Sequence, residues 1–240
     1  MKYIVKSKTE PPTLKKYRLT PNATYSGYQK NLDNPLHRGQ GSKGTAKISD
    51  LKDSLLKEQG YICCYCMQGI TETNMKVEHF KSQTTYPHLQ LSYGNMLAAC
   101  KGIGLKDSQH CDTSKGNQEI SLDPTNFTKN CERILKYLSN GRIYANDSII
   151  DNNPVIDNDL CKILKLNLQS LCDERRAILK ALQKGLEIKS PNNSASKSAT
   201  IRLLKQKLKE WSSKDSQGRY RAYCQVAVFY LQKRIDRLQQ

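Results

Sequence analysis

The spacing of the cysteines constrains this chain more than any other feature of its sequence. Cys63 and Cys66 form a CxxC pair, and Cys100 and Cys111 follow further along the chain. Two thiolates from one tight turn can bind a single tetrahedral zinc ion, and a second pair can complete its coordination. Because no secretory leader is evident, the nine cysteines are better interpreted as metal ligands and buried thiols than as disulfides. We therefore predict a small fold organised around structural zinc.

The second cysteine pair is irregular. The ten residues between Cys100 and Cys111 exceed the two to four of an ordinary zinc knuckle. Three arrangements remain open: a loop inserted into the knuckle, replacement of one cysteine by His110, or a cage that has lost its metal. We expect all four cysteines with an inserted loop. Cys64 should point away from the ion, and the other cysteines fall mostly on apolar helical faces.

A carboxylate and a histidine lie side by side between the cysteine pairs. Glu78 and His79 belong to a short β-like run, residues 76–80. A carboxylate can bind a hard divalent cation, and a neutral imidazole can take a proton from water near pH 7. Neighbours on a flat strand point to opposite faces, so we expect a bulge or bend if both act on one phosphate. The pair predicts metal-assisted phosphodiester hydrolysis.

Further polar residues complete the candidate site. Asn95 precedes an apolar run, and its amide could fix the His79 ring or brace a loop; a plain turn residue is the alternative. Asp112 is a candidate second oxygen ligand for Mg²⁺, with Asn117 and His110 as alternatives. Lys115 is a candidate phosphate contact.

The basic charge lies at the two ends of the chain. The net charge is +17, and residues 1–50 and 195–240 contain 10 and 11 Lys or Arg against 3 acidic residues each. This excess favours a polyanionic partner such as nucleic acid. Arg38 and Lys43 lie in a Gly-rich stretch that suits contact with phosphates, although it could equally be a linker. No run approaches the length of a membrane span, so we expect a cytoplasmic protein without membrane contact.

Local patterns predict an α+β protein with three parts. Residues 1–46 form a basic extended arm rich in proline and glycine, residues 47–125 the metal-braced core, and residues 126–240 a hairpin followed by helices. The core begins with a helix that ends at Gly60. The hairpin turns at Asn140-Gly141, where a type I′ turn is expected. Helices are predicted over 157–185, 201–211 and 220–238, with a linker at 190–198.

The motif order resembles that of the HNH endonucleases. This resemblance, over roughly residues 60–118, implies a zinc-braced ββα-metal core in which His79 is the general base, Glu78 and Asp112 hold Mg²⁺, and Asn95 is the middle motif residue. Two departures are Asp112, where many family members have a third histidine, and the stretched Cys100–Cys111 interval. The motifs that carry it are Cys-Cys-Tyr-Cys, Val-Glu-His-Phe, Asn-Met-Leu-x-x-Cys and Cys-Asp-Thr-Ser-Lys-Gly-Asn.

Within that family the chain resembles the HNH nuclease subunit of Septu-type anti-phage systems, also found with retrons. The resemblance implies a toxic effector nuclease with an ABC-like ATPase partner, and in retron systems also a reverse transcriptase and its DNA. We expect DNA as the substrate. Cleavage of RNA such as tRNA, and a non-catalytic zinc-ribbon adaptor that binds nucleic acid, are the alternatives. An aromatic group near the end of the chain is a candidate partner surface: Tyr220, Tyr223, Phe229 and Tyr230.

Overall fold

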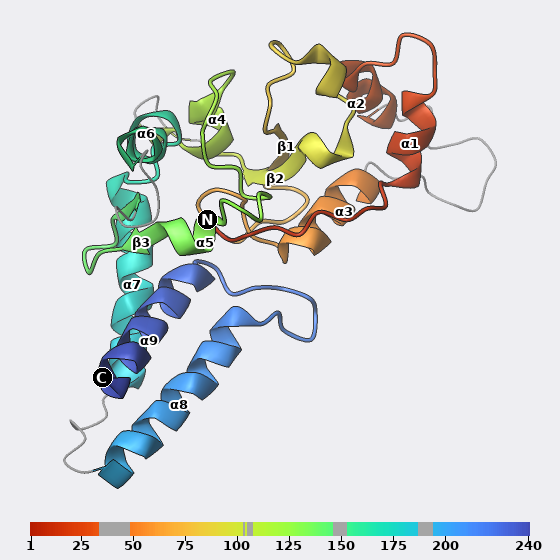
Figure 1. Ribbon diagram of the computed structural model, residues 1–240. Coiled ribbons are helices and arrows are strands. Elements are labelled where there is room, and N and C mark those ends of the chain that lie inside the picture. The colour runs from red at the N-terminus through yellow and green to blue at the C-terminus, as the bar shows by residue number, and fades with distance from the viewer. Residues whose placement is uncertain (34–48, 103, 105–107, 146–152, 187–193) are drawn as a thin grey trace.

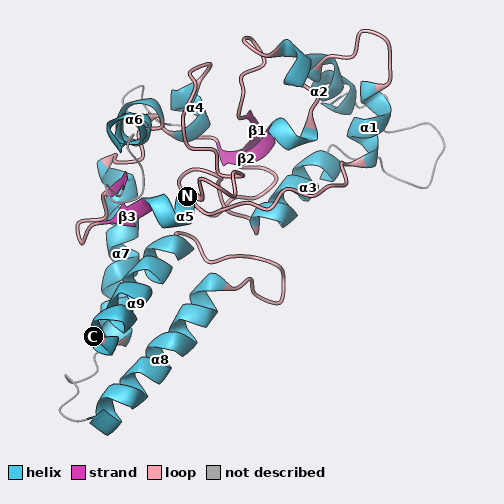
Figure 2. Cartoon of the chain, viewed as in Figure 1, coloured by secondary structure: helices cyan, strands magenta, loops and turns pink. Residues whose placement is uncertain are grey.

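The protein is an α+β fold in which helices predominate, as Figures 1 and 2 show. The computed structural model describes residues 1–33, 49–102, 104, 108–145, 153–186 and 194–240. The two sheets are antiparallel and two-stranded. The elements that surround the sheet of β1 and β2 lie at one end of the molecule, and helices α7, α8 and α9 extend to the other. The predicted α+β class is therefore confirmed.

The first 33 residues fold onto the body of the protein. They contain helices α1 (Pro12–Arg18) and α2 (Tyr25–Asp33), so the expectation of an extended arm is wrong for this part. Pro12 lies in the first turn of α1, where a missing N–H costs nothing, and Leu14 is fully buried. Burial of apolar side chains therefore outweighs the loop-like composition. Arg38 and Lys43 lie outside the described residues.

Helix α3 (Ser49–Gln59) leads into the cysteine region, as predicted. Leu51 and Leu55 are buried on one face, and the helix ends before Gly60, which has a φ of +62°. A side chain at Gly60 would collide with the Tyr220 ring, so the position favours glycine for packing as well as for conformation. After Gly60 an isolated β-bridge joins Ile62 to Gly69.

An antiparallel strand pair carries the candidate site. Strand β1 (Met75–His79) pairs with β2 (Met96–Cys100), with Met75 opposite Cys100 and His79 opposite Met96. Every residue of β2 is buried. Two short 3₁₀ turns, η2 (Pro87–Leu89) and η3 (Tyr93–Asn95), lie between the strands, and helix α4 (Cys111–Lys115) follows β2. The order is strand, strand, helix.

The predicted hairpin is present, with a different turn. Helix α5 (Cys131–Ile134) runs into β3 (Leu135–Tyr137), which pairs with β4 (Ile143–Ala145). The Leu138 N–H donates to Arg142 O, and positive φ occurs at Gly141 rather than at Asn140. The turn is thus a three-residue loop with a left-handed glycine, not the expected two-residue type I′ turn. A Cβ at Gly141 would meet the Cys172 carbonyl.

The helix predicted over 157–185 is interrupted. Helix α6 (Asn153–Asn158) continues into the π-helical turn η5 (Asp159–Ile163), and α7 (Gln169–Gly185) begins only after a break. The break leaves the Leu166 carbonyl outside a helix, and the buried Arg175 side chain donates to it and to Gly141 O. One buried arginine therefore connects α7 to the hairpin.

Two antiparallel helices complete the chain. Helix α8 (Ser194–Ser212) begins inside the predicted linker, and α9 (Cys224–Gln239) matches the last predicted helix. Leu204 and Leu231 are fully buried in a small apolar cluster that joins these two helices to the end of α7. None of the helices among the described residues is both long and apolar enough to cross a membrane.

The main core runs from Met1 to Val226 and includes residues on both sides of positions 46 and 125. Whether these positions are domain boundaries stays a prediction. The aromatic residues considered for a partner surface contribute to packing within the chain, and their contact with a partner stays a prediction. Tyr223 is buried, and the remaining three pack against the core: Tyr220, Phe229 and Tyr230.

Candidate metal and catalytic site

Four cysteine sulfurs lie close together, two from the turn after α3, one from the end of β2 and one from the start of α4. Cys63, Cys66, Cys100 and Cys111 are buried, and their Sγ atoms all lie within 4.8 Å of one another. The Cys63–Cys111 and Cys66–Cys100 sulfur separations are 3.8 and 3.7 Å. A tetrahedron with Zn–S bonds of about 2.3 Å has edges of about 3.8 Å. The cluster could therefore hold a metal ion such as zinc.

The protonation of these thiols suits a metal ligand set. Hydrogen bonding from the Cys111 thiol lowers the pKa of Cys100 to about 7. Burial opposes ionisation of Cys63, but hydrogen bonding with Cys100 and Cys111 holds its pKa well below the usual value. Burial instead raises the pKa of Cys64 well above normal. Cys64 is not in the cluster, in agreement with the prediction that it points away.

Backbone contacts fix both halves of the cluster. The Cys63 N–H donates to Gln68 O within the first turn, and the Cys111 N–H donates to Leu164 O at the end of η5. His110 Nε2 lies 3.7 Å from Cys100 Sγ, beside the sulfurs rather than in place of one. The structure therefore favours the arrangement in which all four cysteines form the cluster over the one in which His110 replaces a cysteine.

A cleft of about 630 Å³ lies beside β1 and α4. Four of the predicted site residues line it: Glu78, His79, Asp112 and Asn117. Tyr25 and Tyr28 of α2 and Lys52 of α3 form another part of its wall. The pattern of strand, strand and helix thus brings together residues that are far apart in the sequence.

Glu78 is held by a buried pair of donors. Its Oε1 accepts from the Tyr65 hydroxyl at 2.7 Å and lies 2.8 Å from Lys115 Nζ. The Glu78 and Lys115 side chains are 2% and 0% exposed. The sequence predicted that Lys115 contacts a phosphate, but in the fold its ammonium group is buried against Glu78. Burial raises the pKa of Glu78, and Lys115 and Tyr65 oppose only part of this rise.

His79 is oriented by two hydrogen bonds. Its Nε2 lies 2.9 Å from Gln90 O and its Nδ1 lies 3.1 Å from Gln83 Nε2. A carbonyl can only accept, so Nε2 carries the proton and Nδ1 keeps a lone pair. Burial lowers the pKa of His79, and nearby Lys115 lowers it further, against the Gln90 carbonyl. The ring is therefore neutral near pH 7, with Nδ1 as its basic atom.

The strand geometry differs from the sequence-based expectation. The β1–β2 register continues to His79 without the expected bulge. The contacts of Glu78 and His79 diverge, as expected of strand neighbours. Glu78 reaches Tyr65 and Lys115, whereas His79 reaches Gln83 and Gln90, yet both residues line the same cleft.

Asn95 braces the segment that follows His79. Its side chain accepts from the Lys81 N–H at 2.8 Å and donates to Lys81 O and Leu89 O at 2.9 and 3.3 Å. Its own carbonyl accepts from the Phe80 N–H. Of the two roles considered for Asn95, the contacts support the loop brace and show no bond to the His79 ring.

The residues considered as second metal ligand are separated by the fold. Asp112 lies in the first turn of α4, and its Oδ2 is 2.5 Å from Lys76 Nζ. Asn117 lines the same cleft, whereas His110 lies at the sulfur cluster. Asp112 and Asn117 therefore remain candidates. Each carboxylate of the site is neutralised by a lysine: Glu78 by Lys115 and Asp112 by Lys76.

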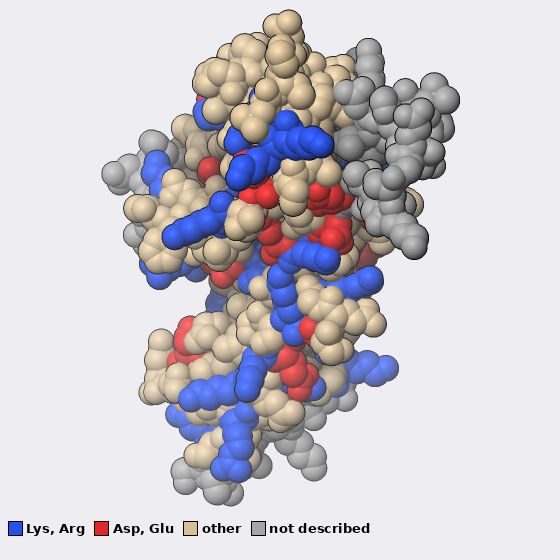
Figure 3. Space-filling view, turned by 90° about the vertical axis from the view of Figure 1, so that its right-hand side faces the viewer, with Lys and Arg blue, Asp and Glu red and all other residues tan. Residues whose placement is uncertain are grey.

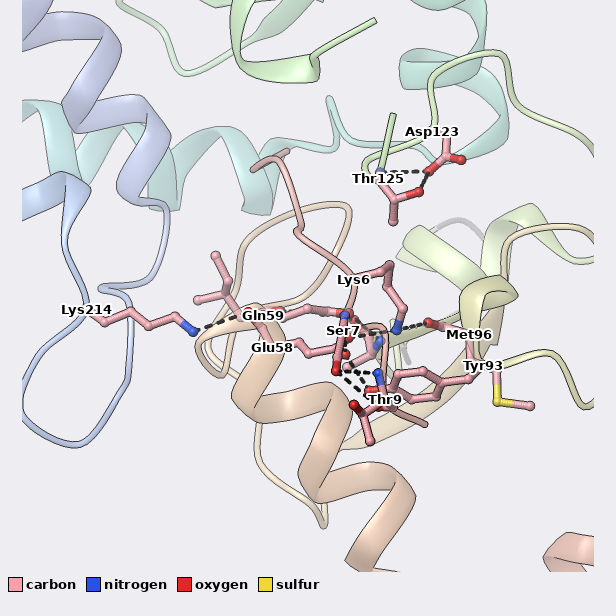
Figure 4. A network of polar contacts seen from close by, with 12 residues as sticks. Lys6, Ser7, Thr9, Glu58, Gln59, Tyr93, Met96, Asp123, Thr125 and Lys214 are labelled. Carbon is pink, nitrogen blue, oxygen red and sulfur yellow. Dashed lines mark hydrogen bonds and ion pairs between the residues drawn. The ribbon is translucent and has the colours of Figure 1, made fainter. Parts of the chain in front are cut away.

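Figure 4 shows a polar network beside β2 that the sequence does not predict. Lys6 Nζ lies 2.7 Å from Glu58 Oε2 and 3.1 Å from Met96 O, and the Tyr93 hydroxyl donates to Glu58 Oε1 at 2.6 Å. The buried Gln59 side chain adds bonds to Ala98 N and O. These contacts hold η3 and the start of β2, and so fix Asn95. Isolated Lys, Glu and Gln residues have no local pattern that predicts such bonds.

Comparison with known proteins adds one relative. The chain is similar to Septu protein PtuB of Bacillus thuringiensis, with 31% identity over 104 residues, which is 42% of this chain and 39% of that protein. The chain thus matches about two fifths of the length of this relative. No family model matches the chain.

Proposed function

We propose that the protein is a metal-dependent HNH endonuclease that hydrolyses phosphodiester bonds of DNA, with a zinc-braced ββα core made by β1, β2 and α4. One observation carries the proposal. His79, neutral and with the Gln83 amide on its basic Nδ1, lines the same cleft as Glu78 and Asp112, and the four clustered cysteines include the last residue of β2 and the first of α4. A non-catalytic zinc-ribbon adaptor would not require His79, Glu78 and Asp112 to line one cleft.

The proposed reaction assigns a task to each polar side chain. His79 Nδ1 takes a proton from a water molecule in the cleft, and the water oxygen attacks phosphorus. The Gln90 carbonyl stabilises the resulting imidazolium, because Nε2–H already donates to it. Gln83, whose amide donates to Nδ1 here, marks the place that the water must take. Asn95 holds the loop that carries these partners.

The donor sets fit two metals. The four thiolates suit zinc, which would brace the core. The carboxylates of Glu78 and Asp112, with the Asn117 amide nearby, offer the oxygen atoms that Mg²⁺ prefers. Mg²⁺, when bound, would stabilise charge on the phosphoryl group and on the departing 3′ oxygen. Lys115 serves as the buried counter-charge of Glu78 in this proposal, rather than as a DNA contact.

Similarity to a Septu protein supports a role in anti-phage defence. We propose that the chain is the effector subunit of such a system and acts with an ATPase encoded beside it. Arg38 and Lys43 remain proposed contacts to nucleic acid.

The test is cleavage of plasmid DNA with and without Mg²⁺. His79→Ala should lower the rate by about 10²–10⁴-fold, the usual contribution of a positioned base. His88→Ala is the matched control, because His88 is exposed and does not line the cleft. Both variants should keep the parental metal content and circular dichroism. Cleavage by His79→Ala at the parental rate would refute the mechanism.

A second set of reactions tests the substrate and the partner. Plasmid, single-stranded DNA and total tRNA are incubated with the protein, alone and with the neighbouring ATPase. We expect cleavage of DNA and sparing of tRNA. Cleavage of tRNA alone would move the substrate to RNA, because a base that attacks phosphorus through water does not require a 2′-hydroxyl.

A further inference from the structure

The outer face of α8 carries a row of exposed cations. Helix α8 contains five Lys or Arg residues and a single acid, Glu210. Arg202, Lys205 and Lys209 recur at steps of three and four residues, so they share one face of the helix. All three side chains are exposed. The opposite face carries Leu204 and Leu208, which pack in the apolar cluster between the helices.

This row differs from most other cations of the same region. Lys207 is paired with Glu210 at 2.9 Å, Arg221 lies over the Trp211 ring, and Lys214 donates to backbone carbonyls of α3. None of the three residues of the row has an ion-pair or hydrogen-bond partner for its side chain within the described part of the chain. In Figure 3, which looks toward the α8 side, Lys and Arg outnumber acidic side chains over the lower part of the molecule.

We infer that the α8 row, Arg202, Lys205 and Lys209, binds the phosphate backbone of double-stranded DNA at a surface separate from the cleft. The row spans about 10 Å of straight helix at 1.5 Å per residue. Duplex DNA presents about one negative charge per 1.7 Å of its axis, so several phosphates face such a row. Surfaces for single strands combine cations with stacking aromatic rings, and the row itself contains no aromatic residue.

The row lies far from the candidate site along the fold. The cleft is lined by parts of α2, α3, β1 and α4, and none of its residues belongs to α8 or α9. Figure 1 places α8 at the opposite end of the molecule from α2 and α4. A duplex held at α8 would therefore be tethered without occupying the reacting cleft. The inference rests on the proposed function only for its choice of DNA over other polyanions.

The test is binding of a fluorescent 20-base-pair duplex without added divalent metal, so that cleavage does not enter the measurement. The variant R202Q/K205Q/K209Q removes the row. The control K129Q/R133Q/K162Q removes the same charge from exposed residues elsewhere on the surface. Affinity is measured by fluorescence anisotropy at several salt concentrations, after circular dichroism and metal content show that both proteins are folded.

Each phosphate contact contributes about 0.9 to the slope of log affinity against log salt. The row variant should lose about 2–3 from this slope and bind about tenfold or more weakly, while the control should lose less than about 1. Equal losses in both variants, or none in the row variant, would overturn the inference. Binding of an RNA hairpin or an acidic protein through the row, with no binding of duplex DNA, would overturn it as well.

The outcome is independent of the nuclease assay. A protein that binds DNA through the row but does not cleave it with Mg²⁺ would contradict the proposed function and leave the inference intact. If the protein cleaves DNA and the row variant binds DNA normally, the proposed function is supported and the inference about α8 is contradicted.

Discussion

The cysteine region and the α8–α9 pair are stabilised by different kinds of interaction. Among the described residues between 61 and 117 no helix or strand exceeds five residues, and five polar or charged residues are buried: Glu78, His79, Ser82, Asn95 and Lys115. The α8–α9 pair consists of two helices of 19 and 16 residues joined by apolar side chains such as Leu204 and Leu231.

The difference indicates where the free energy of each part originates. The cysteine region combines buried apolar side chains with buried charges and short elements, so it also depends on its ligand set and on satisfied hydrogen bonds. The helical pair depends on apolar burial, at about 25 cal/mol per Å². The two parts should therefore respond to different perturbations.

Removal of metal should have the largest effect, and this effect should be confined to the cysteine region. Binding at a structural zinc site contributes about 10–16 kcal/mol in small zinc domains, and this energy is folding energy. Cys66→Ser or a strong chelator should therefore expose the amides of β1 and β2 to hydrogen exchange, while those of α8 and α9 stay protected. Elemental analysis should find about one zinc per chain in the parent protein.

Cys64→Ser is the control for metal removal, because Cys64 is buried in the same turn but lies outside the cluster. It should keep its zinc. Loss of metal from Cys64→Ser, with retention in Cys66→Ser, would mean that the ligands are wrongly assigned.

Lys115→Met should be the next most damaging change. It leaves the Glu78 carboxylate buried without its counter-charge, which typically costs about 3–5 kcal/mol. Adding Glu78→Gln should recover part of the loss, as measured by urea unfolding. Lys76→Met is the control, since its pair with Asp112 is 39% exposed on the lysine side and should contribute less than about 1 kcal/mol. Equal losses for both lysines would contradict the assigned role of burial.

Leu204→Ala should weaken the helical pair without affecting the metal. A fully buried leucine replaced by alanine costs about 2–5 kcal/mol. We expect faster hydrogen exchange in α8 and α9, with parental zinc content and parental protection of β2. Leu203→Ala, at a half-buried neighbour, should cost less. Loss of zinc from Leu204→Ala would show that the two parts are coupled more strongly than their contacts indicate.

Tyr65→Phe should have the smallest effect in this series, and it tests how much the Tyr65 hydroxyl stabilises the buried Glu78 carboxylate. It removes one donor to Glu78 and keeps the ring, which should cost about 1–3 kcal/mol. Tyr61→Phe is the matched control, because the Tyr61 side chain is half-buried and its hydroxyl has no hydrogen-bond partner among the described residues. Its cost should stay within about 0.5 kcal/mol. Chemical denaturation of both variants measures these changes in the free energy of unfolding.

Local patterns predicted the elements well where one residue spacing dominates. The helix that ends at Gly60, the 135–145 hairpin and the two final helices follow from apolar periodicity and turn residues. The errors lie where distant contacts override local preference. Residues 12–18 are helical because Leu14 packs into the core, and the helix predicted from 157 breaks where Arg175 can satisfy the freed carbonyl of Leu166.

The sequence alone identifies the candidate metal ligands and the candidate reactive groups. The two cysteine pairs, Glu78, His79, Asn95 and Asp112 can be picked out by residue type and spacing, since few other roles suit those residues in that order. The fold brings the four sulfurs to within 4.8 Å, a result that the spacing of the second pair left open.

The interactions that hold these groups depend on how the elements pack. The tertiary structure paired Lys115 with Glu78 instead of with a phosphate, set the His79 tautomer through Gln90 and Gln83, and gave Asn95 the role of a loop brace. Each of these interactions depends on a contact between different elements or across a loop, and on burial of the groups that make it. Sequence spacing describes neighbours along one element, whereas burial and charge pairing arise only when elements pack together.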